Sequence, residues 1–330
     1  MGKKISQLTL AATPYEGEEL FAMVEDNSTV AAPLSTLQTY MSGQNHIASP
    51  FKNNRFACTQ TFLGAISGMD KLTVGTVATH TNTGTVATIA GGRDNSVAGN
   101  CGIIGGGCGN SITGVTYGVI GGGQDNTVSA GCGSVLGGKS NTASTGDATV
   151  GGGDNNTASG CGATVAGGCK NTSSGSYAYS TGKQNATTGE CSTIAGGFCN
   201  TVVGDLAVLA GGASNQARGD YASVVGGLSS CAIGKASAVV GGSCNCVTGL
   251  SAFVGAGQIN KATGDGSAIV GGTSNNTPGS AAFVGAGQGN NASSQNAFVG
   301  AGWSQTASGK CSTAVGGCGN TASGEISFVG

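Results

Sequence analysis

One 15-residue unit recurs from residue 87 to residue 330, in the form Ala-x-Val-x-Gly-Gly-x-x-Asn-x-Ala-x-Gly, and it constrains the fold more than any other feature. The asparagine gives the clearest register, and we call its position the anchor. The sixteen anchors are Asn95, Asn110, Asn126, Asn141, Asn156, Asn171, Asn185, Asn200, Asn215, Ser230, Asn245, Asn260, Asn275, Asn290, Gln305 and Asn320. They lie 15 residues apart, except for one interval of 16 before Asn126 and one of 14 before Asn185. A fixed period of this kind predicts a solenoid, in which each repeat packs on its neighbours.

Apolar and small residues alternate with a period of two on both sides of the anchor. Six residues before it lies an aliphatic column, made of Ile89, Ile104, Ile120, Val135, Val150, Val165, Ile194, Leu209, Val224, Val239, Val254, Ile269, Val284 and Val299. Eight residues before it lies a small-residue column, made of Ala87, Gly102, Gly118, Gly133, Ala148, Ala163, Ala207, Ala222, Ala252 and Ala282. Two residues after it lies a second apolar column, made of Val97, Ile112, Val128, Ala143, Ala158, Val202, Ala217, Ala232, Val247 and Ala262. Because side chains alternate between the two faces of a strand, each unit is predicted to hold two short strands with one buried face each.

Glycines mark both turns of the unit. The pair after the first strand, as at Gly211 and Gly212, suits a turn that needs positive φ, and a glycine four residues after the anchor, as at Gly219, suits the other turn. Two strands and two turns make one flat coil, and neighbouring coils pair through backbone hydrogen bonds about 4.8 Å apart. The sequence therefore predicts an all-β fold, a parallel β-solenoid (β-roll) of about sixteen 15-residue coils that stack to roughly 75 Å.

Composition agrees with a repeat array and argues against several other classes. Glycine contributes 65 of 330 residues and charged residues only 8%, against about 7% glycine and about 25% charge in ordinary domains. Glycine does not recur at every third position, which excludes collagen, and the low charge argues against the usual kind of disorder. No basic run suits nucleic acid, and no apolar stretch approaches the roughly 20 residues needed for membrane insertion.

A further apolar set lies seven residues before the anchor, on the opposite face from the buried columns. We call this position the outer column, and its large apolar members are Ile103, Val119, Val208, Phe253, Phe283, Phe298 and Phe328. The predicted core is made mostly of Ala, Gly and Val, so a single chain buries little and a slender solenoid needs lateral partners. The outer column is therefore predicted to be a buried seam between chains.

The first 86 residues lack the repeat and form two further segments. Residues 1–42 are predicted to be a small mixed module, with a strand over residues 18–24, a turn at 26–27, a second strand over residues 28–31 and a helix over residues 33–41. Residues 43–86 are assigned to a transition segment and residues 87–330 to the shaft of repeats.

Two motifs match ligand-binding patterns through composition alone. Residues 133–140, Gly-Ser-Val-Leu-Gly-Gly-Lys-Ser, fit the P-loop pattern, but the repeat predicts a strand after them rather than the helix whose N–H groups hold phosphate. Asp94, Asp125 and Asp154 follow glycine pairs, yet their spacing does not supply the successive carboxylates of a calcium-binding repeat. No cofactor is expected.

The 13 cysteines are scattered and have no zinc-site spacing, since Cys244 and Cys246 are too close together and both histidines lie far away. Most are expected to be reduced and to act as small apolar fillers. Cys231 and Cys246 share a register on adjacent coils, where a bridge is sterically conceivable.

Two further functions of solenoids each require a specific arrangement of side chains. Glycoside hydrolysis needs two carboxylates in one groove, and Asp205 and Asp220, which share a register on adjacent coils, are interpreted as solvated turn residues.

An ice-binding solenoid needs a continuous threonine row. The outer column carries Thr88, Thr149, Thr164 and Thr193, but Ile103, Val119, Ser134 and Val208 interrupt it. We expect no catalytic, cofactor-binding or metal-binding residues, and a protein that is not an enzyme.

Residues 251–257, Ser-Ala-Phe-Val-Gly-Ala-Gly, and residues 320–324, Asn-Thr-Ala-Ser-Gly, resemble the head repeats of YadA-like trimeric autotransporter adhesins and the similar repeats of phage tail fibres. The likeness covers residues 87–330. It implies a left-handed parallel β-roll, three chains side by side, and a role in adhesion or display. The family period is usually 14, and the doubled glycines and the cysteines depart from its pattern. The lack of a secretion signal, stalk or membrane anchor favours a virion fibre over an autotransporter.

These observations lead to one functional expectation. The chain is expected to be a structural and adhesive fibre protein of a virion tail, synthesised in the host cytoplasm and assembled as a homotrimer. The N-terminal module is expected to dock to tail or baseplate proteins. A distal tip beyond Gly330 is expected to bind a host cell-surface receptor, because the chain stops part-way into a coil. The first alternative is a bacterial trimeric adhesin head. A polysaccharide-degrading tailspike and an ice-binding solenoid are alternatives that the sequence supports less.

Overall fold

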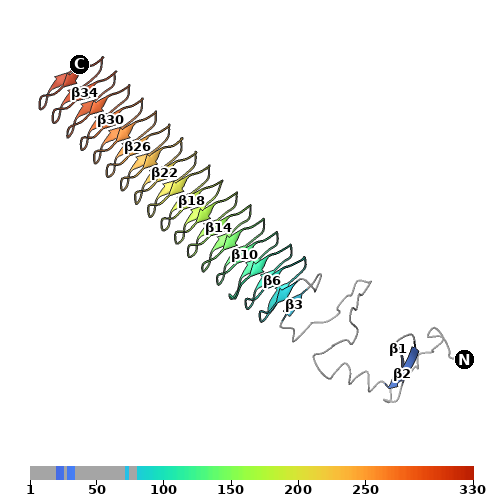
Figure 1. The fold of residues 1–330 in the computed structure, drawn as a ribbon. Coiled ribbons are helices and arrows are strands. Elements are labelled where there is room, and N and C mark those ends of the chain that lie inside the picture. The colour runs from blue at the N-terminus through green and yellow to red at the C-terminus, as the bar shows by residue number, and fades with distance from the viewer. Residues whose placement is uncertain (1–19, 26–27, 34–70, 74–79) are drawn as a thin grey trace, which may run out of the picture. The chain divides into compact units, whose positions relative to one another are not determined.

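A computed structural model describes residues 20–25, 28–33, 71–73 and 80–330 (Figure 1). Backbone contacts divide the chain into two units, Met1–Ile66 and Ser67–Gly330. In the first unit, β1 (Leu20–Glu25) pairs antiparallel with β2 (Ser28–Pro33), and Glu25 lies opposite Ser28. The predicted hairpin is therefore confirmed, whereas the predicted helix lies almost wholly outside the described residues.

The second unit is the predicted parallel β-solenoid, with about seventeen turns along the odd-numbered strands β5 to β37 (Figure 1). The first strand of each turn enters one parallel sheet, in which every strand pairs in register with those of the turns before and after it. This sheet contains β3 (Lys71–Thr73), β5 (Ala87–Ile89), β7 (Ile103–Ile104), β9 (Val119–Ile120), β11 (Ser134–Val135), β13 (Thr149–Val150), β15 (Thr164–Val165), β17 (Tyr179–Ser180), β19 (Thr193–Ile194), β21 (Val208–Leu209), β23 (Ser223–Val224), β25 (Ala238–Val239), β27 (Phe253–Val254), β29 (Ala268–Ile269), β31 (Phe283–Val284), β33 (Phe298–Val299), β35 (Thr313–Ala314) and β37 (Phe328–Val329).

The second strand of each turn forms another parallel sheet in the same manner. It contains β4 (Thr81–Asn82), β6 (Ser96–Val97), β8 (Ser111–Ile112), β10 (Thr127–Val128), β12 (Thr142–Ala143), β14 (Thr157–Ala158), β16 (Thr172–Ser173), β18 (Ala186–Thr187), β20 (Thr201–Val202), β22 (Gln216–Ala217), β24 (Cys231–Ala232), β26 (Cys246–Val247), β28 (Lys261–Ala262), β30 (Asn276–Thr277), β32 (Asn291–Ala292), β34 (Thr306–Ala307) and β36 (Thr321–Ala322). A third ladder of single bridges joins the residues two before each anchor, from Arg93 to Cys318.

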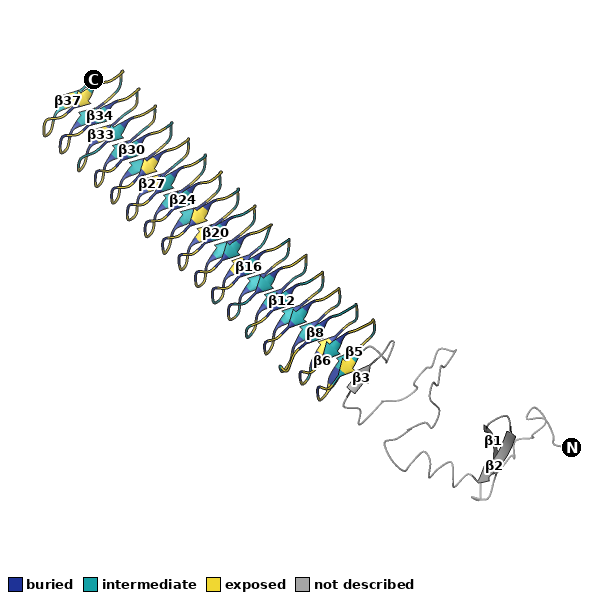
Figure 2. Ribbon diagram, in the orientation of Figure 1, coloured by how far each residue is buried: buried dark blue, intermediate teal, exposed yellow. Residues whose placement is uncertain are grey.

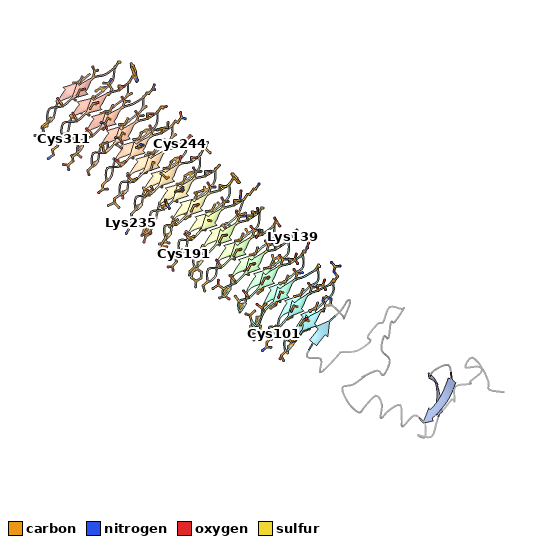
Figure 3. All side chains as sticks on the ribbon, in the orientation of Figure 1. Cys101, Lys139, Cys191, Lys235, Cys244 and Cys311 are labelled. Atoms are coloured by element: carbon orange, nitrogen blue, oxygen red, sulfur yellow. The ribbon has the colours of Figure 1, made fainter. Side chains whose placement is uncertain are left out.

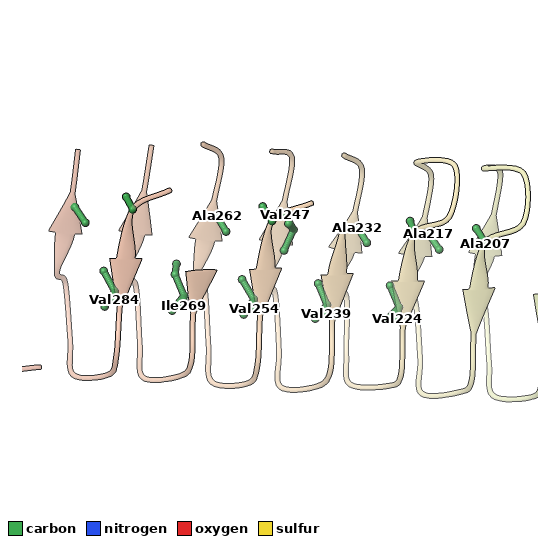
Figure 4. Close-up of a cluster of buried hydrophobic side chains, with 14 of the residues drawn as sticks. Ala207, Ala217, Val224, Ala232, Val239, Val247, Val254, Ala262, Ile269 and Val284 are labelled. Carbon is green, nitrogen blue, oxygen red and sulfur yellow. The ribbon is translucent and has the colours of Figure 1, made fainter. Parts of the chain in front are cut away.

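The core lies between the two sheets, and the predicted inward columns form it (Figures 2 and 4). The aliphatic column is fully buried from Ile89 to Val299, as is the second apolar column from Val97 to Ala307. Branched side chains from the first sheet meet Ala or Val from the second, so the core is only about one side chain thick on each side. Stacking of neighbouring coils, rather than burial within one coil, therefore creates the apolar core.

The second glycine of each pair adopts the positive φ that the sequence predicted, as at Gly212 with a φ of 87°. The glycine four residues after the anchor has a different role. Gly219 does not have positive φ, but a Cβ added there would lie 2.2 Å from the carbonyl oxygen of Gly234 in the next coil. Glycine is therefore required in this turn because the close approach of two backbones excludes a side chain, and not because the turn needs positive φ.

Positive φ in the other two corners falls on residues with side chains in most coils, and on glycine in a few, as at Gly109 and Gly162. Ser214, just before an anchor, has a φ of 56°, and Leu206, nine residues before that anchor, has a φ of 57°. Their N–H groups donate to carbonyls of the preceding coil, Phe198 and Glu190, whereas strand N–H groups such as that of Val208 donate to the following coil. At each of these corners the left-handed conformation turns the peptide N–H towards the preceding coil, where a carbonyl accepts its hydrogen bond.

The two adjacent glycines of a pair provide a matched test of this geometry. Gly212→Ala places a methyl group 2.3 Å from the carbonyl oxygen of Gly227 in a left-handed conformation, whereas a Cβ at Gly211 meets nothing within 4 Å. We expect Gly212→Ala to lower the free energy of unfolding by about 3 kcal/mol, and Gly211→Ala to change it by less than about 1 kcal/mol. Urea denaturation followed by circular dichroism measures both, and equal effects would contradict the assignment.

Candidate binding surfaces

The anchor asparagines point inward and are fully buried from Asn95 to Asn290, apart from about 1% exposure at Asn185 and Asn275. Asn156 shows the pattern. Its Oδ1 accepts a hydrogen bond of 3.0 Å from the N–H of Asn171, and its Nδ2 donates to the carbonyls of Gly152 at 2.8 Å and Gly168 at 2.9 Å. Each anchor amide therefore ties the glycine turn of its own coil to that of the next. The asparagines therefore form a hydrogen-bonded ladder inside the solenoid, which is a buried structural element rather than a ligand surface.

Two anchors depart from asparagine and weaken this ladder. Ser230 accepts the N–H of Asn245 at 3.3 Å, and no bond from Ser230 to the glycine turn of the next coil takes the place of the asparagine Nδ2 bond. Gln305 donates to the carbonyl of Trp303, but its buried Oε1 has no hydrogen-bond partner. The junction after Ser230 is thus held by fewer side-chain hydrogen bonds than the junctions around Asn156.

Exchanging the two residue types tests the contribution of the ladder. Ser230→Asn restores a donor for the carbonyls of Gly226 and Gly242, so we expect it to raise the free energy of unfolding by about 1–2 kcal/mol. Asn156→Ser removes the equivalent bonds from an intact junction and should lower it by a similar amount. Chemical denaturation checks both variants, and a neutral Ser230→Asn would show that the amide bonds add little.

The outer column points away from the core, as predicted. Ile103, Val208, Phe253 and Phe298 are between 36% and 47% exposed, and Phe283 is half-buried. The residue two positions further along each strand shares this face. Across both positions, from Thr88 to Gly330, none of the residues is charged. We call these two columns together the outer face.

In many coils, one of the two columns of the outer face holds a large side chain and the other a small one. Where the outer column has phenylalanine, its partner is glycine, and a Cβ added to Gly255, Gly285 or Gly300 would lie 3.4–3.6 Å from Cε1 of the phenylalanine ring. Where the outer column has alanine, the partner is valine, as at Ala238 with Val240 and Ala268 with Val270. The rings of Phe283 and Phe298 stack on neighbouring coils at 5.2 Å between centroids. Each coil from Val208 to Phe328 therefore presents a large apolar side chain on this face, whereas the coils of Thr149, Thr164 and Thr193 present threonine with glycine or alanine.

The second sheet presents a face of different chemistry. Its outward residues, one after each anchor, form a column of hydroxyl groups over six coils: Ser96, Ser111, Thr127, Thr142, Thr157 and Thr172. Thr113, Ser129, Ser144, Ser159 and Ser174 lie two residues further along the same strands. We call these residues the hydroxyl face. This uninterrupted hydroxyl column, unlike the threonines of the outer column, was not among the rows predicted from the sequence, although the fixed register identifies it.

The turns that follow the second strand hold a recess of about 320 Å³, lined by Glu190, Cys191, Asp205, Leu206, Asp220, Tyr221 and Lys235. Cys191 and Lys235 project from the same side of the coil stack (Figure 3). Asp205 and Asp220 lie on adjacent coils, as predicted. Their Oδ1 atoms accept backbone N–H groups of the preceding coil, from Glu190 at 2.8 Å and from Asp205 at 3.2 Å. A glycosidase needs carboxylates in unlike environments for its acid and nucleophile roles, whereas these two occupy equivalent positions and cap the turns.

The other motifs from the sequence acquire a structural explanation. Residues 133–140 run from strand β11 through a glycine turn towards strand β12, so no helix N-terminus lies next to them. Within residues 80–330, no group of three or more His, Cys, Asp and Glu side chains could hold a metal ion. The described part of the chain also contains no helix long and apolar enough to cross a membrane.

Comparison with known proteins does not extend this picture. No protein-family model matches the chain, and no curated protein matches it either. The geometry of the described surfaces is therefore the basis for assigning a function.

Proposed function

We propose that this chain is the shaft of a homotrimeric fibre on a virion tail, a structural and adhesive protein rather than an enzyme. In this proposal the N-terminal module docks to tail or baseplate proteins, and the shaft displays a tip that binds a host cell-surface receptor. A trimeric bacterial adhesin head is the alternative assembly with the same shaft. The observation that carries the proposal is the outer face, which has no charged residue from Thr88 to Gly330 and a large apolar side chain on every coil from Val208 to Phe328.

The chemistry of the outer face supports burial against other copies of the chain. Interfaces are depleted in charge and enriched in aromatic residues at their centres, and the outer face has no charge and concentrates phenylalanine between Phe253 and Phe328. Charged residues lie at the corners and on the other faces, as at Arg93, Lys183 and Asp220. A large apolar surface of this kind on a soluble protein marks an interaction site.

A trimer also supplies what a single coil stack lacks. The core of one chain is narrow, and association along the outer face would add a second apolar layer for each of its coils. The proposed mechanism is passive: parallel backbone ladders give stiffness along the axis, and three chains multiply weak receptor contacts into avidity.

Light scattering after size exclusion tests the trimer. We expect a native mass about three times the 31.4 kDa of the chain. Phe283→Ser combined with Phe298→Ser should yield monomers, because two stacked rings leave the proposed seam. Phe198→Ser with Trp303→Ser is the matched control, since these exposed aromatic side chains lie on the bridge ladder, outside the outer face. A wild-type monomer, or dissociation only in the control, would contradict the proposal.

The hydroxyl face supports a second candidate function, binding to ice. Six coils in register place hydroxyl groups in one straight row, and five of them add a second hydroxyl row beside it, at the spacing of a parallel sheet, about 4.8 Å. Thermal hysteresis measures this activity. If the face binds ice, Thr142→Lys with Thr157→Lys should abolish the hysteresis, whereas Phe283→Ser with Phe298→Ser should leave it. A wild-type protein without hysteresis removes this candidate.

A further inference from the structure

Two cysteines of the second sheet lie side by side at one junction between coils. Cys231 on β24 and Cys246 on β26 are in-register partners of adjacent parallel strands, and both are half-buried free thiols. In the strand and bridge ladders that the structure describes, the other cysteines face residues of other types, as Cys108 faces Arg93 and Gln124. This pairing is therefore special within the second unit.

The geometry permits a disulfide without a large backbone movement. Paired strands bring the Cα atoms to about 4.8 Å, inside the usual range of about 4.4–6.8 Å for disulfides. Parallel Cβ vectors place the Cβ atoms at a similar separation, slightly beyond the relaxed range of about 3.5–4.5 Å. A bridge at this site would therefore be mildly strained, and strained disulfides are the ones that are readily reduced.

The surroundings distinguish the two thiols chemically. The thiol of Cys231 hydrogen-bonds to Cys246, and this bond, together with the charge of Lys261, lowers the pKa of Cys246 to about 7 in spite of partial burial. The same bond, with burial and the neighbouring Cys246 charge, raises the pKa of Cys231, against the opposing effect of Arg218. Because Lys261 lies beside Cys246 in register and its charge favours the thiolate, Cys246 is assigned as the attacking sulfur and Cys231 as the resolving thiol.

The pair also spans the junction where the anchor ladder is weakest. Ser230, the anchor that lacks the asparagine amide, immediately precedes Cys231, and Asn245, whose N–H it accepts at 3.3 Å, immediately precedes Cys246. A bond between the two sulfur atoms would join the same two coils that have lost a ladder bond. This coincidence is independent of the chemistry of the thiols.

We propose that Cys231 and Cys246 are a redox-active dithiol that exchanges with small-molecule disulfides and closes a reversible bridge between two neighbouring coils. The oxidant is a low-molecular-weight disulfide such as glutathione disulfide. The Cys246 thiolate attacks one of its sulfur atoms, breaks its S–S bond and releases one glutathione thiolate. Cys231 then loses its proton to solvent and attacks Sγ of Cys246, which releases the second glutathione. Two protein thiols are oxidised, and one disulfide is reduced to two thiols.

The test treats the full, reduced chain with glutathione disulfide, traps free thiols by alkylation and maps peptides by mass spectrometry. At pH 7 we expect Cys246 to react roughly three- to six-fold faster than the exposed turn residues Cys132 and Cys311, since its larger thiolate fraction outweighs its lower intrinsic nucleophilicity. The advantage should disappear near pH 9, where ordinary thiols ionise too. The product should be a Cys231–Cys246 disulfide.

Two variants make the outcome decisive. Cys231→Ser should stop the reaction at a mixed disulfide between Cys246 and glutathione. Thr142→Cys with Thr157→Cys, made in a Cys231→Ser, Cys246→Ser chain, places thiols in the same column at a junction with intact anchors, and it should react several-fold more slowly because no lysine follows it in register. Equal rates at all sites, or a bridge to another cysteine, would overturn the proposal.

A structural readout completes the test. Oxidation should slow backbone hydrogen exchange at Asn245 and Val247, which lie at the junction, by several-fold, and Ser230→Asn should reduce that difference by strengthening the same junction in the reduced protein. Unchanged exchange in the oxidised chain would contradict the role of the bridge in joining the coils.

Discussion

The solenoid depends on one buried interaction, the clamp between an anchor amide and two glycine turns. An asparagine side chain has one acceptor oxygen and two donor hydrogens, and an anchor such as Asn156 uses all of them within two coils. One of the two carbonyls that it reaches, that of the next coil, lies at a glycine where a Cβ would collide with the coil beyond, as at Gly168. The asparagine and the glycine are therefore coupled: the amide fits only because the turn has no side chain, and the turn stays in place because the amide binds it.

Once the hydrogen bonds of the anchor amides fix the register of the coils, the positions of the outward-facing residues follow from the alternation of side chains along each strand. Each strand residue that faces outward repeats at the spacing of the sheet, so any chemistry placed there becomes a column along the axis. The apolar outer face, the hydroxyl face and the carboxylates capping the turns are three such columns with different side chains. The dithiol at Cys231 and Cys246 arises in the same way, from one residue type that happens to occupy a column twice in succession.

Much of this architecture could be predicted from the sequence, because a fixed period identifies equivalent positions before any coordinates are known. The inward columns, the two strands of each coil and the outward direction of Phe253 and Phe298 all followed from it. The role of Gly219 did not, since a close approach between coils depends on atoms 15 residues away. The left-handed conformation of Leu206 and Ser214 was missed for a related reason: the hydrogen bond that holds each of them comes from the preceding coil.

The two irregular intervals show how the fold tolerates change. The extra residue before Asn126 lies between β8 and β9, where Gly114 has a φ of 60° and open space around it. The missing residue before Asn185 lies in the glycine turn, where the Thr181 carbonyl still accepts the anchor amide. Both changes are absorbed at corners, and the strand pairing on either side stays in register. Whole coils are consequently interchangeable units, so an in-frame gain or loss of about 45 nucleotides would alter the length of the shaft by about 4.8 Å and leave its cross-section unchanged.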